Sequence, residues 1–274
     1  MEDDMKRYLD AKSKLPLLDL DRAARFYEVI YVVDQVFTKF NIEYSLTGGT
    51  LLGAIRHKGM IPWDDDLDVM VFEPGHERMF ETDVVREFNR YGFNMYVEGS
   101  RRFNRGLTFK FVNHVYKETN LGSRELLTDK YFTIPNVSYQ GKVNKTKYNA
   151  GRKFFDTELC DFFPHREVRP DVWKPLWTPY TKNDRDILYT NEIWPLRKTK
   201  FGKYEASVVN DPVSYLKRWA GEDCLERPNW NRWHGLERKP TMKQRKYVLD
   251  NPEHIRDLIV PCLFDKNSIE LLDF

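Results

Sequence analysis

Residues 64–71, which read DDDLDVMV, constrain the fold more than any other part of the chain. From Asp66 onward, acidic and apolar residues alternate, and in a strand the residues two apart point to the same face. We therefore expect a strand over residues 67–72, with Asp66 and Asp68 on one face. The opposite face carries the apolar residues that enter a core, namely Leu67, Val69 and Val71. The alternative is an acidic surface turn in front of a strand.

The paired carboxylates of this run predict a cation site. Two carboxylates held side by side repel each other unless a cation lies between them. Oxygen ligands of this kind suit magnesium, with manganese as the alternative ion. We therefore expect a divalent metal at Asp66 and Asp68.

A glycine turn precedes the acidic run and predicts a phosphate-binding element. Residues 42–46 alternate as a short strand, Gly48 and Gly49 interrupt it, and residues 50–56 continue as a helix. Glycine lacks a Cβ, so its backbone amides can come close to a phosphate, whose charge a helix N-terminus favours. A glycine pair alone is more often a plain turn, but a turn that opens a helix before paired acids is more specific. Gly48, Gly49 and Thr50 are therefore candidate substrate-binding residues.

The remaining chain predicts helices and strands in mixed order, from helical spacing of apolar residues and from short apolar runs between turns. The expected elements are helices over residues 21–40, 76–89 and 211–220, and strands over residues 106–112 and 157–163, the last stopped by Pro164. We expect an α+β or α/β fold with a mixed central sheet that carries the acids and is flanked by helices. An irregular C-terminal portion, rich in Trp and Pro, would complete the cleft.

Length and composition indicate one soluble unit. The 274 residues are 41% hydrophobic, and we expect a single domain over residues 21–265 between tails at 1–20 and 266–274. Lys and Arg total 44 against 42 for Asp and Glu, which argues against a nucleic-acid partner. The 3 cysteines have no ligand spacing, and no apolar run approaches the roughly 18 residues of a membrane span. We expect a cytoplasmic enzyme, and the sequence indicates no oligomeric state.

Residues 46–68, which read LTGGTLLGAIRHKGMIPWDDDLD, resemble the signature of the LicD family. This family includes bacterial phosphocholine transferases and fukutin-related proteins, and it belongs to the nucleotidyltransferase superfold. Asp161 and the three residues after it (DFFP) resemble the later acidic strand of the family, and residues 194–216 echo its C-terminal block. The resemblance implies a nucleotidyltransferase-like fold and a transferase that uses a nucleotide-linked donor.

The resemblance also implies that Asp66, Asp68 and Asp161 form a catalytic, metal-binding triad, with Asp64 as a further ligand candidate. Such a triad supports in-line displacement at phosphorus, in which metal ions activate the acceptor hydroxyl and neutralise the leaving group. Asp161 would assist as the base. From the residues alone, Asp161 could also cap a turn near Pro164, and this alternative stays open.

Three residues between the glycine turn and the acids are candidate donor contacts. Arg56 and His57 end the predicted helix and could bind donor phosphates, for which the planar guanidinium of arginine is well suited. Alternatively, these cations complement the dipole at the helix C-terminus. Trp63 could stack on a nucleotide base or pack in the core.

The leading hypothesis is transfer of phosphocholine or a polyol phosphate from a cytidine-diphosphate-linked donor to a glycan hydroxyl. Donor and acceptor classes come from the resemblance, because no residue selects a cytosine base. A first alternative keeps the fold and the metal but transfers a nucleoside monophosphate. A second is a binding module without turnover that recognises a glycan or a partner. The presence of all the expected acids argues against the binding module.

Overall fold

A computed structural model of the chain describes residues 2–64, 66–79, 81–91, 93–99, 107–113, 158–175, 184–226, 241–251 and 258–264. The chain divides into two compact units. Unit 1 consists of Met1–Tyr31, Ser45–Leu67 and Thr190–Phe274, and unit 2 consists of Val32–Tyr44 and Asp68–Tyr189. The single domain predicted over residues 21–265 stays a prediction.

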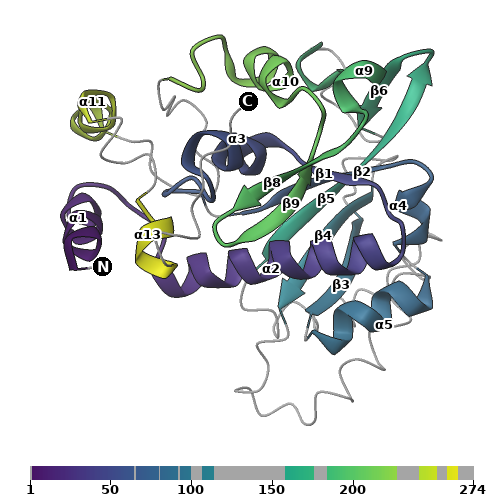
Figure 1. The fold of residues 1–274 in the computed structure, drawn as a ribbon, viewed down its shortest axis with the longest axis horizontal. Coiled ribbons are helices and arrows are strands. Elements are labelled where there is room, and N and C mark those ends of the chain that lie inside the picture. Colours follow the sequence, from purple (N-terminus) through teal and green to yellow (C-terminus); the bar gives the residue numbers. More distant parts are fainter. Residues whose placement is uncertain are drawn as a thin grey trace. The chain divides into compact units, whose positions relative to one another are not determined.

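Unit 2 contains a mixed sheet (Figure 1). Its strands are β2 (Asp68–Phe72), β3 (Phe93–Gly99), β4 (Leu107–Asn113), β5 (Glu158–Arg169), β6 (Val172–Pro175) and β7 (Leu188–Tyr189). They lie in the order β2-β5-β4-β3, while β6 pairs with β5 and with β7. β2 and β5 are parallel, and the other pairs are antiparallel. A parallel pair requires a long connection, and here it contains α4 (Gly75–Arg78), α5 (Thr82–Arg90), β3 and β4.

Phe37 is the centre of the aromatic core in unit 2. It belongs to α2 (Leu20–Lys39), which begins in unit 1 and ends in unit 2. Its ring centroid lies 5.5 Å from that of Tyr44, 5.7 Å from Phe88 of α5 and 5.6 Å from Phe162 of β5. Aromatic rings at these separations attract one another beyond the gain from burial. Through these ring contacts, the second part of α2 and α5 pack against the sheet. α5 also lies against β3 (Figure 1).

The described residues of unit 1 form helices and a hairpin. The helices are α1 (Glu2–Lys12), the first part of α2, α3 (Gly48–His57), α9 (Thr190–Ile193), α10 (Pro212–Ala220), α11 (Met242–Asp250) and α13 (Val260–Leu263). β8 (Arg197–Phe201) and β9 (Tyr204–Val208) form the hairpin. The boundary between the units falls within β1 (Tyr44–Leu46). Among the described helices, none combines the length and the apolar character that crossing a membrane requires.

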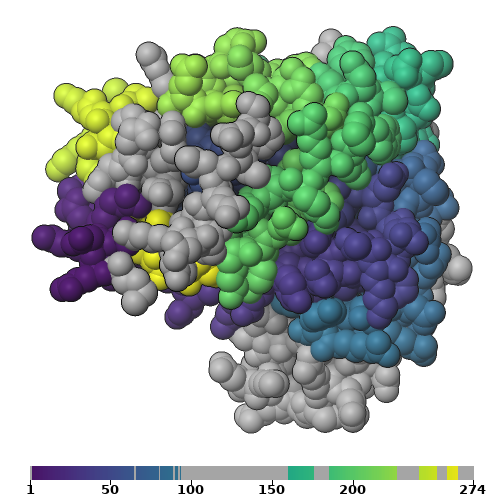
Figure 2. All heavy atoms as spheres, viewed as in Figure 1, coloured from purple at the N-terminus to yellow at the C-terminus, as the bar shows by residue number. Residues whose placement is uncertain are grey.

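Tyr27 organises the core of unit 1. Its ring contacts Phe201 of β8 and Phe264, with centroids 5.1 and 5.0 Å away. Four residues later in α2, Tyr31 contacts Tyr204 at 4.9 Å, where the hairpin lies at the surface in Figure 2. The hairpin is thus held to the first part of α2 by aromatic contacts one helical turn apart.

The fold is α+β with a mixed sheet and helices, as predicted. Four predicted elements are found close to their expected bounds: α2, β2, β4 and α10, the last with proline in its first turn. The single helix predicted over residues 76–89 is wrong, because α4 ends at Arg78 and α5 begins at Thr82. The C-terminal portion is more regular than predicted, since α9, β8, β9 and α10 follow one another closely.

The strand end predicted at Pro164 is also wrong. β5 is paired with β4 up to Phe162 and with β6 from His165 onward. Pro164 lies at this change of partner, where the strand tolerates a residue that has no N–H. Its parallel pairing with β2 continues through this point, with Pro164 opposite Val71.

Candidate active site

A pair of aspartates on neighbouring strands of unit 2 forms one part of the candidate site. β2 and β5 are parallel, and Asp68 lies opposite Asp161 in their register. Paired residues of adjacent strands direct their side chains to the same face, and the strands are about 4.8 Å apart. Both aspartates are partly exposed, whereas the next pair, Val69 and Phe162, is buried. The structure therefore places two of the three predicted triad residues on one face, with a hydrophobic core behind them.

The apolar residues of the acidic run are buried as predicted. Leu67, Val69 and Val71 all have 0% relative exposure. Met70, which shares a face with Asp68, is buried as well. Beyond Asp68 the strand is covered on both faces, so it exposes a carboxylate only at its beginning.

Asp66, the third predicted triad residue, lies before the strand. β2 begins at Asp68, and Asp66 belongs to the partly exposed stretch that leads into it. A common face for Asp66 and Asp68 requires strand geometry at both residues. The boundary between the units falls between Leu67 and Asp68, so this common face stays a prediction.

The glycine turn of unit 1 has the predicted form. Thr47 is the N-cap of α3 with extended φ and ψ of −141° and 176°, and Gly48 follows with a positive φ of 54°. A positive φ at this position favours glycine. A Cβ built on Gly49 would lie 2.5 Å from Asp64 Oδ2, so the Asp64 carboxylate lies against the first turn of α3. The structure thus brings Asp64 to Gly49, the middle one of the candidate substrate residues Gly48, Gly49 and Thr50.

Arg56 and His57 are buried side chains that bond to each other and to the rest of unit 1. Arg56 is 6% exposed; its Nε donates to His57 Nε2 at 2.9 Å, and its Nη1 donates to the Cys224 carbonyl at 2.8 Å. Trp63 is buried, and its ring makes an edge contact with His57 at 5.9 Å. These contacts favour the alternatives of helix C-terminal stabilisation for Arg56 and of core packing for Trp63. Donor binding by these residues stays a prediction.

A buried tyrosine holds the loop that leads from α3 to the acids. The Met60 N–H donates to Tyr27 Oη at 3.0 Å, and Tyr27 is fully buried. The Lys58 carbonyl accepts the N–H of Gly202 at 2.8 Å, and the Pro62 carbonyl accepts an N–H from Leu18 at 2.7 Å. Three separate segments of unit 1 therefore fix the backbone just before Asp64. The sequence contains no local signal for these contacts, because the partners lie far from the loop in the chain.

The donor chemistry of Asp68 and Asp161 fits a hard divalent cation. Both side chains supply carboxylate oxygens, the ligands that magnesium prefers, and they share one face of the sheet. Across the described part of the chain, no group of three or more His, Cys, Asp or Glu side chains is arranged to hold a metal ion. The structure thus presents an aspartate pair, and the four-residue metal set with Asp66 and Asp64 stays a prediction.

One family of known proteins matches the part of the chain that contains both the glycine turn and the acidic run. Residues 41–120 match the family model described as LicD/FKTN/FKRP, nucleotidyltransferase domain. The resemblance to the LicD family is confirmed. The lipopolysaccharide cholinephosphotransferase LicD of Haemophilus influenzae is 56% identical over 57 residues, which cover 21% of this chain and 21% of that protein.

Two uncharacterized rickettsial proteins are similar over a longer stretch. One, from Rickettsia typhi, is 25% identical over 224 residues, covering 82% of this chain and 52% of the relative. The other, from Rickettsia prowazekii, is 24% identical over 212 residues, covering 77% of this chain and 57% of the relative. The chain thus spans about half the length of these relatives.

Proposed function

We propose that the chain is a metal-dependent transferase of nucleotidyltransferase-like fold that moves a substituted phosphate from a nucleotide donor to a hydroxyl group. The observation that carries the proposal is the position of Asp68 opposite Asp161, with Asp66 two residues earlier in the chain. Paired carboxylates on one sheet face suit the binding of a cation and phosphates. The glycine turn adds a segment without side-chain bulk at the start of α3.

The transferred group follows from the relative and the family. The name of the Haemophilus protein, a lipopolysaccharide cholinephosphotransferase, supports phosphocholine as the group and a glycan hydroxyl as the acceptor. The family resemblance implies a cytidine-diphosphate-linked donor and allows a polyol phosphate as the other group.

In the proposed reaction, Asp66, Asp68 and Asp161 would hold Mg²⁺ or Mn²⁺, which supplies charge neutralisation at the phosphates when bound. Gly48 carries no Cβ and would let the donor phosphates approach the backbone, while Gly49 leaves room for the Asp64 carboxylate beside them. The acceptor oxygen forms a bond to the phosphorus of the transferred group as the bond to the nucleoside monophosphate breaks. Asp161 accepts the proton that the acceptor hydroxyl loses.

The test measures metal-dependent binding and turnover of a panel of nucleotide-linked donors by calorimetry and mass spectrometry. We expect Asp68→Asn and Asp161→Asn each to weaken binding of the donor with its metal at least tenfold and to abolish turnover. Asp83→Asn is the matched control, since Asp83 is an exposed carboxylate on α5 of the same unit. Equal binding by all variants, or no nucleotide binding by the folded parent protein, would refute the proposal and favour a binding module.

A second candidate is transfer of a nucleoside monophosphate, which the description of the matching domain as a nucleotidyltransferase favours. The same metal site would serve both reactions, so the aspartate variants do not separate them. The product mass does, because the acceptor gains either the substituted phosphate or the nucleotide.

A further inference from the structure

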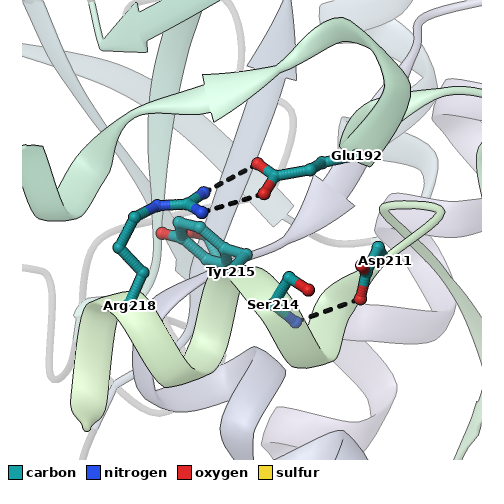
Figure 3. A network of polar contacts seen from close by, with 6 residues as sticks. Glu192, Asp211, Ser214, Tyr215 and Arg218 are labelled. Carbon is teal, nitrogen blue, oxygen red and sulfur yellow. Dashed lines mark hydrogen bonds and ion pairs between the residues drawn. The ribbon is translucent and has the colours of Figure 1, made fainter. Parts of the chain in front are cut away.

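α10 has polar contacts at both of its ends, an N-cap within the helix and an ion pair to α9 (Figure 3). At its N-terminus, Asp211 Oδ1 accepts the Ser214 N–H at 3.0 Å and so caps the helix. Near its C-terminus, the Arg218 guanidinium donates to both carboxylate oxygens of Glu192, at 2.8 and 2.7 Å. Glu192 is a buried residue of α9, and a two-point pair of this kind fixes orientation as well as distance. The position of α10 against α9 is therefore well defined.

This anchored helix presents the hydroxyl of Tyr215 to Thr47. The Tyr215 Oη and Thr47 Oγ1 atoms are 2.9 Å apart, and both side chains are buried. Thr47 is the N-cap residue of α3, and an N-cap threonine usually accepts an N–H from the first turn of its helix. Here the Thr47 side chain makes no capping hydrogen bond. Its hydroxyl is engaged with Tyr215 instead.

A second contact limits how the turn can move. The Val209 N–H donates to Ser45 Oγ at 3.0 Å, two residues before Thr47. The segment that leads into α10 therefore holds the chain before the turn, while α10 itself holds the Thr47 side chain. With the neighbouring Ser45 side chain held by Val209, rotation about χ1 is the main freedom that Thr47 would gain without Tyr215.

We propose that Tyr215 is a positioning residue of the donor site, which keeps the Thr47 hydroxyl from capping α3. The inference rests on the proposed function, in which donor phosphates approach the backbone amides around Gly48 and Gly49. A hydroxyl that rotated to cap α3 would compete with a phosphate for the same N–H donors. Tyr215 thereby favours the form of the turn that accepts the donor.

The experiment compares Tyr215→Phe, Thr47→Ala and the double variant with the parent protein. Tyr8→Phe is the matched control, because Tyr8 is equally buried in unit 1 and its hydroxyl donates to the Leu18 carbonyl at 2.8 Å. One readout is amide hydrogen exchange in the first turn of α3. The other is the Kd of the nucleotide donor found to bind the parent.

We expect Tyr215→Phe to slow exchange in the first turn of α3 and to raise the donor Kd, each about fivefold, the factor that corresponds to one N-cap hydrogen bond. Thr47→Ala removes the hydroxyl that would compete for the N–H groups. Adding Tyr215→Phe to it should therefore change the exchange rate and the donor Kd by no more than about twofold relative to Thr47→Ala alone. Tyr8→Phe should change neither readout at this turn.

Unchanged or faster exchange in Tyr215→Phe would overturn the inference, since a residue that merely supports the fold would loosen the turn when its hydroxyl is removed. A rise in Kd that persists in the double variant would also overturn it. If the folded parent binds no nucleotide, the proposed function fails, whereas the exchange measurement still decides whether Tyr215 restrains Thr47.

Discussion

Alanine at Gly59 is expected to destabilise unit 1 strongly, because this glycine lies against the buried hydroxyl of Tyr27. A Cβ at position 59 would overlap Tyr27 Oη and would lie 2.8 Å from Val260 Cγ2 and 3.0 Å from Tyr27 Cε1. Tyr27 is fully buried, with Phe201 and Phe264 against its ring, so the hydroxyl cannot move aside. The substitution therefore pushes the loop off the tyrosine and breaks the Met60–Tyr27 hydrogen bond.

Two terms set the magnitude. Overpacking a well-packed core costs about 1–3 kcal/mol, and a buried N–H that loses its acceptor costs about 1–3 kcal/mol. Gly59→Ala should thus lower the free energy of unfolding by about 2–6 kcal/mol. Tyr27→Phe should cost about 1–3 kcal/mol, because it removes the same hydrogen bond without adding bulk.

Chemical denaturation of the two single variants and the double variant measures the coupling between the residues. The double variant should be less destabilised than the sum of the single variants by at least about 1 kcal/mol, because Tyr27→Phe removes the oxygen that the new methyl group overlaps and the hydrogen bond is lost only once. Gly75→Ala is the control; its Cβ would lie 3.2 Å from Ile42 Cγ2, and a cost below about 1 kcal/mol is expected. Additive single variants, or a Gly59→Ala protein as stable as the parent, would refute the reasoning.

Three further predictions concern polar groups. Burial raises the pKa of Asp211, but the hydrogen bonds from Ser214 and Val213 and the charge of Arg197 together hold this pKa below its usual value. The stabilising effect of Asp211 should therefore be complete above its unfolded pKa of about 3.9 and should be lost as the pH falls through its folded pKa. Asp211→Ala should lower the free energy of unfolding by about 1 kcal/mol at pH 7. An acid denaturation profile equal to that of the parent protein would contradict this prediction. Burial lowers the pKa of His165 to about 4. The contribution of its neutral ring to stability should therefore be complete above pH 6.5, and the free energy of unfolding should fall by up to about 3 kcal/mol between pH 6.5 and 4. Denaturation curves of His165→Gln taken across this range should not show this fall. Arg218→Met should cost about 1–3 kcal/mol in urea denaturation, because the buried Glu192 carboxylate loses its guanidinium partner, and a variant as stable as the parent would show that the pair contributes nothing.

Local patterns were sufficient to predict the elements that carry the site. Alternation of acidic and apolar residues predicted β2 and the burial of Leu67, Val69 and Val71, since the period of a strand is short enough to read within eight residues. The glycine pair predicted the turn that opens α3, because glycine adopts the positive φ found at Gly48 without strain, whatever its distant neighbours are.

Partners distant in the chain could not be predicted in the same way. The resemblance of the DFFP run grouped Asp161 with Asp68, but no local pattern indicates that the two lie opposite each other, because the register of a parallel pair is set by two segments that are far apart in the chain. The strand end expected at Pro164 was wrong for a related reason, since tolerance of proline depends on which neighbouring strand needs an N–H at that position. Thr47 and Tyr215 are separated by 168 positions, and no periodicity connects them.

Residues 212–224 hold α3 at both ends, which gives the buried Arg56 a role beyond dipole stabilisation. Tyr215 contacts Thr47 at the start of α3, and the Cys224 carbonyl accepts a hydrogen bond from Arg56 Nη1 at the end of α3. Loosening α10 as a whole should therefore affect all of α3, whereas removing the Tyr215 hydroxyl should affect only the first turn. Arg218→Met is accordingly expected to speed amide exchange at both ends of α3, in contrast to the slowing expected at the first turn in Tyr215→Phe. Faster exchange at the first turn in Arg218→Met and slower exchange there in Tyr215→Phe would show that α10 supports α3 and that the Tyr215 hydroxyl separately controls the Thr47 hydroxyl.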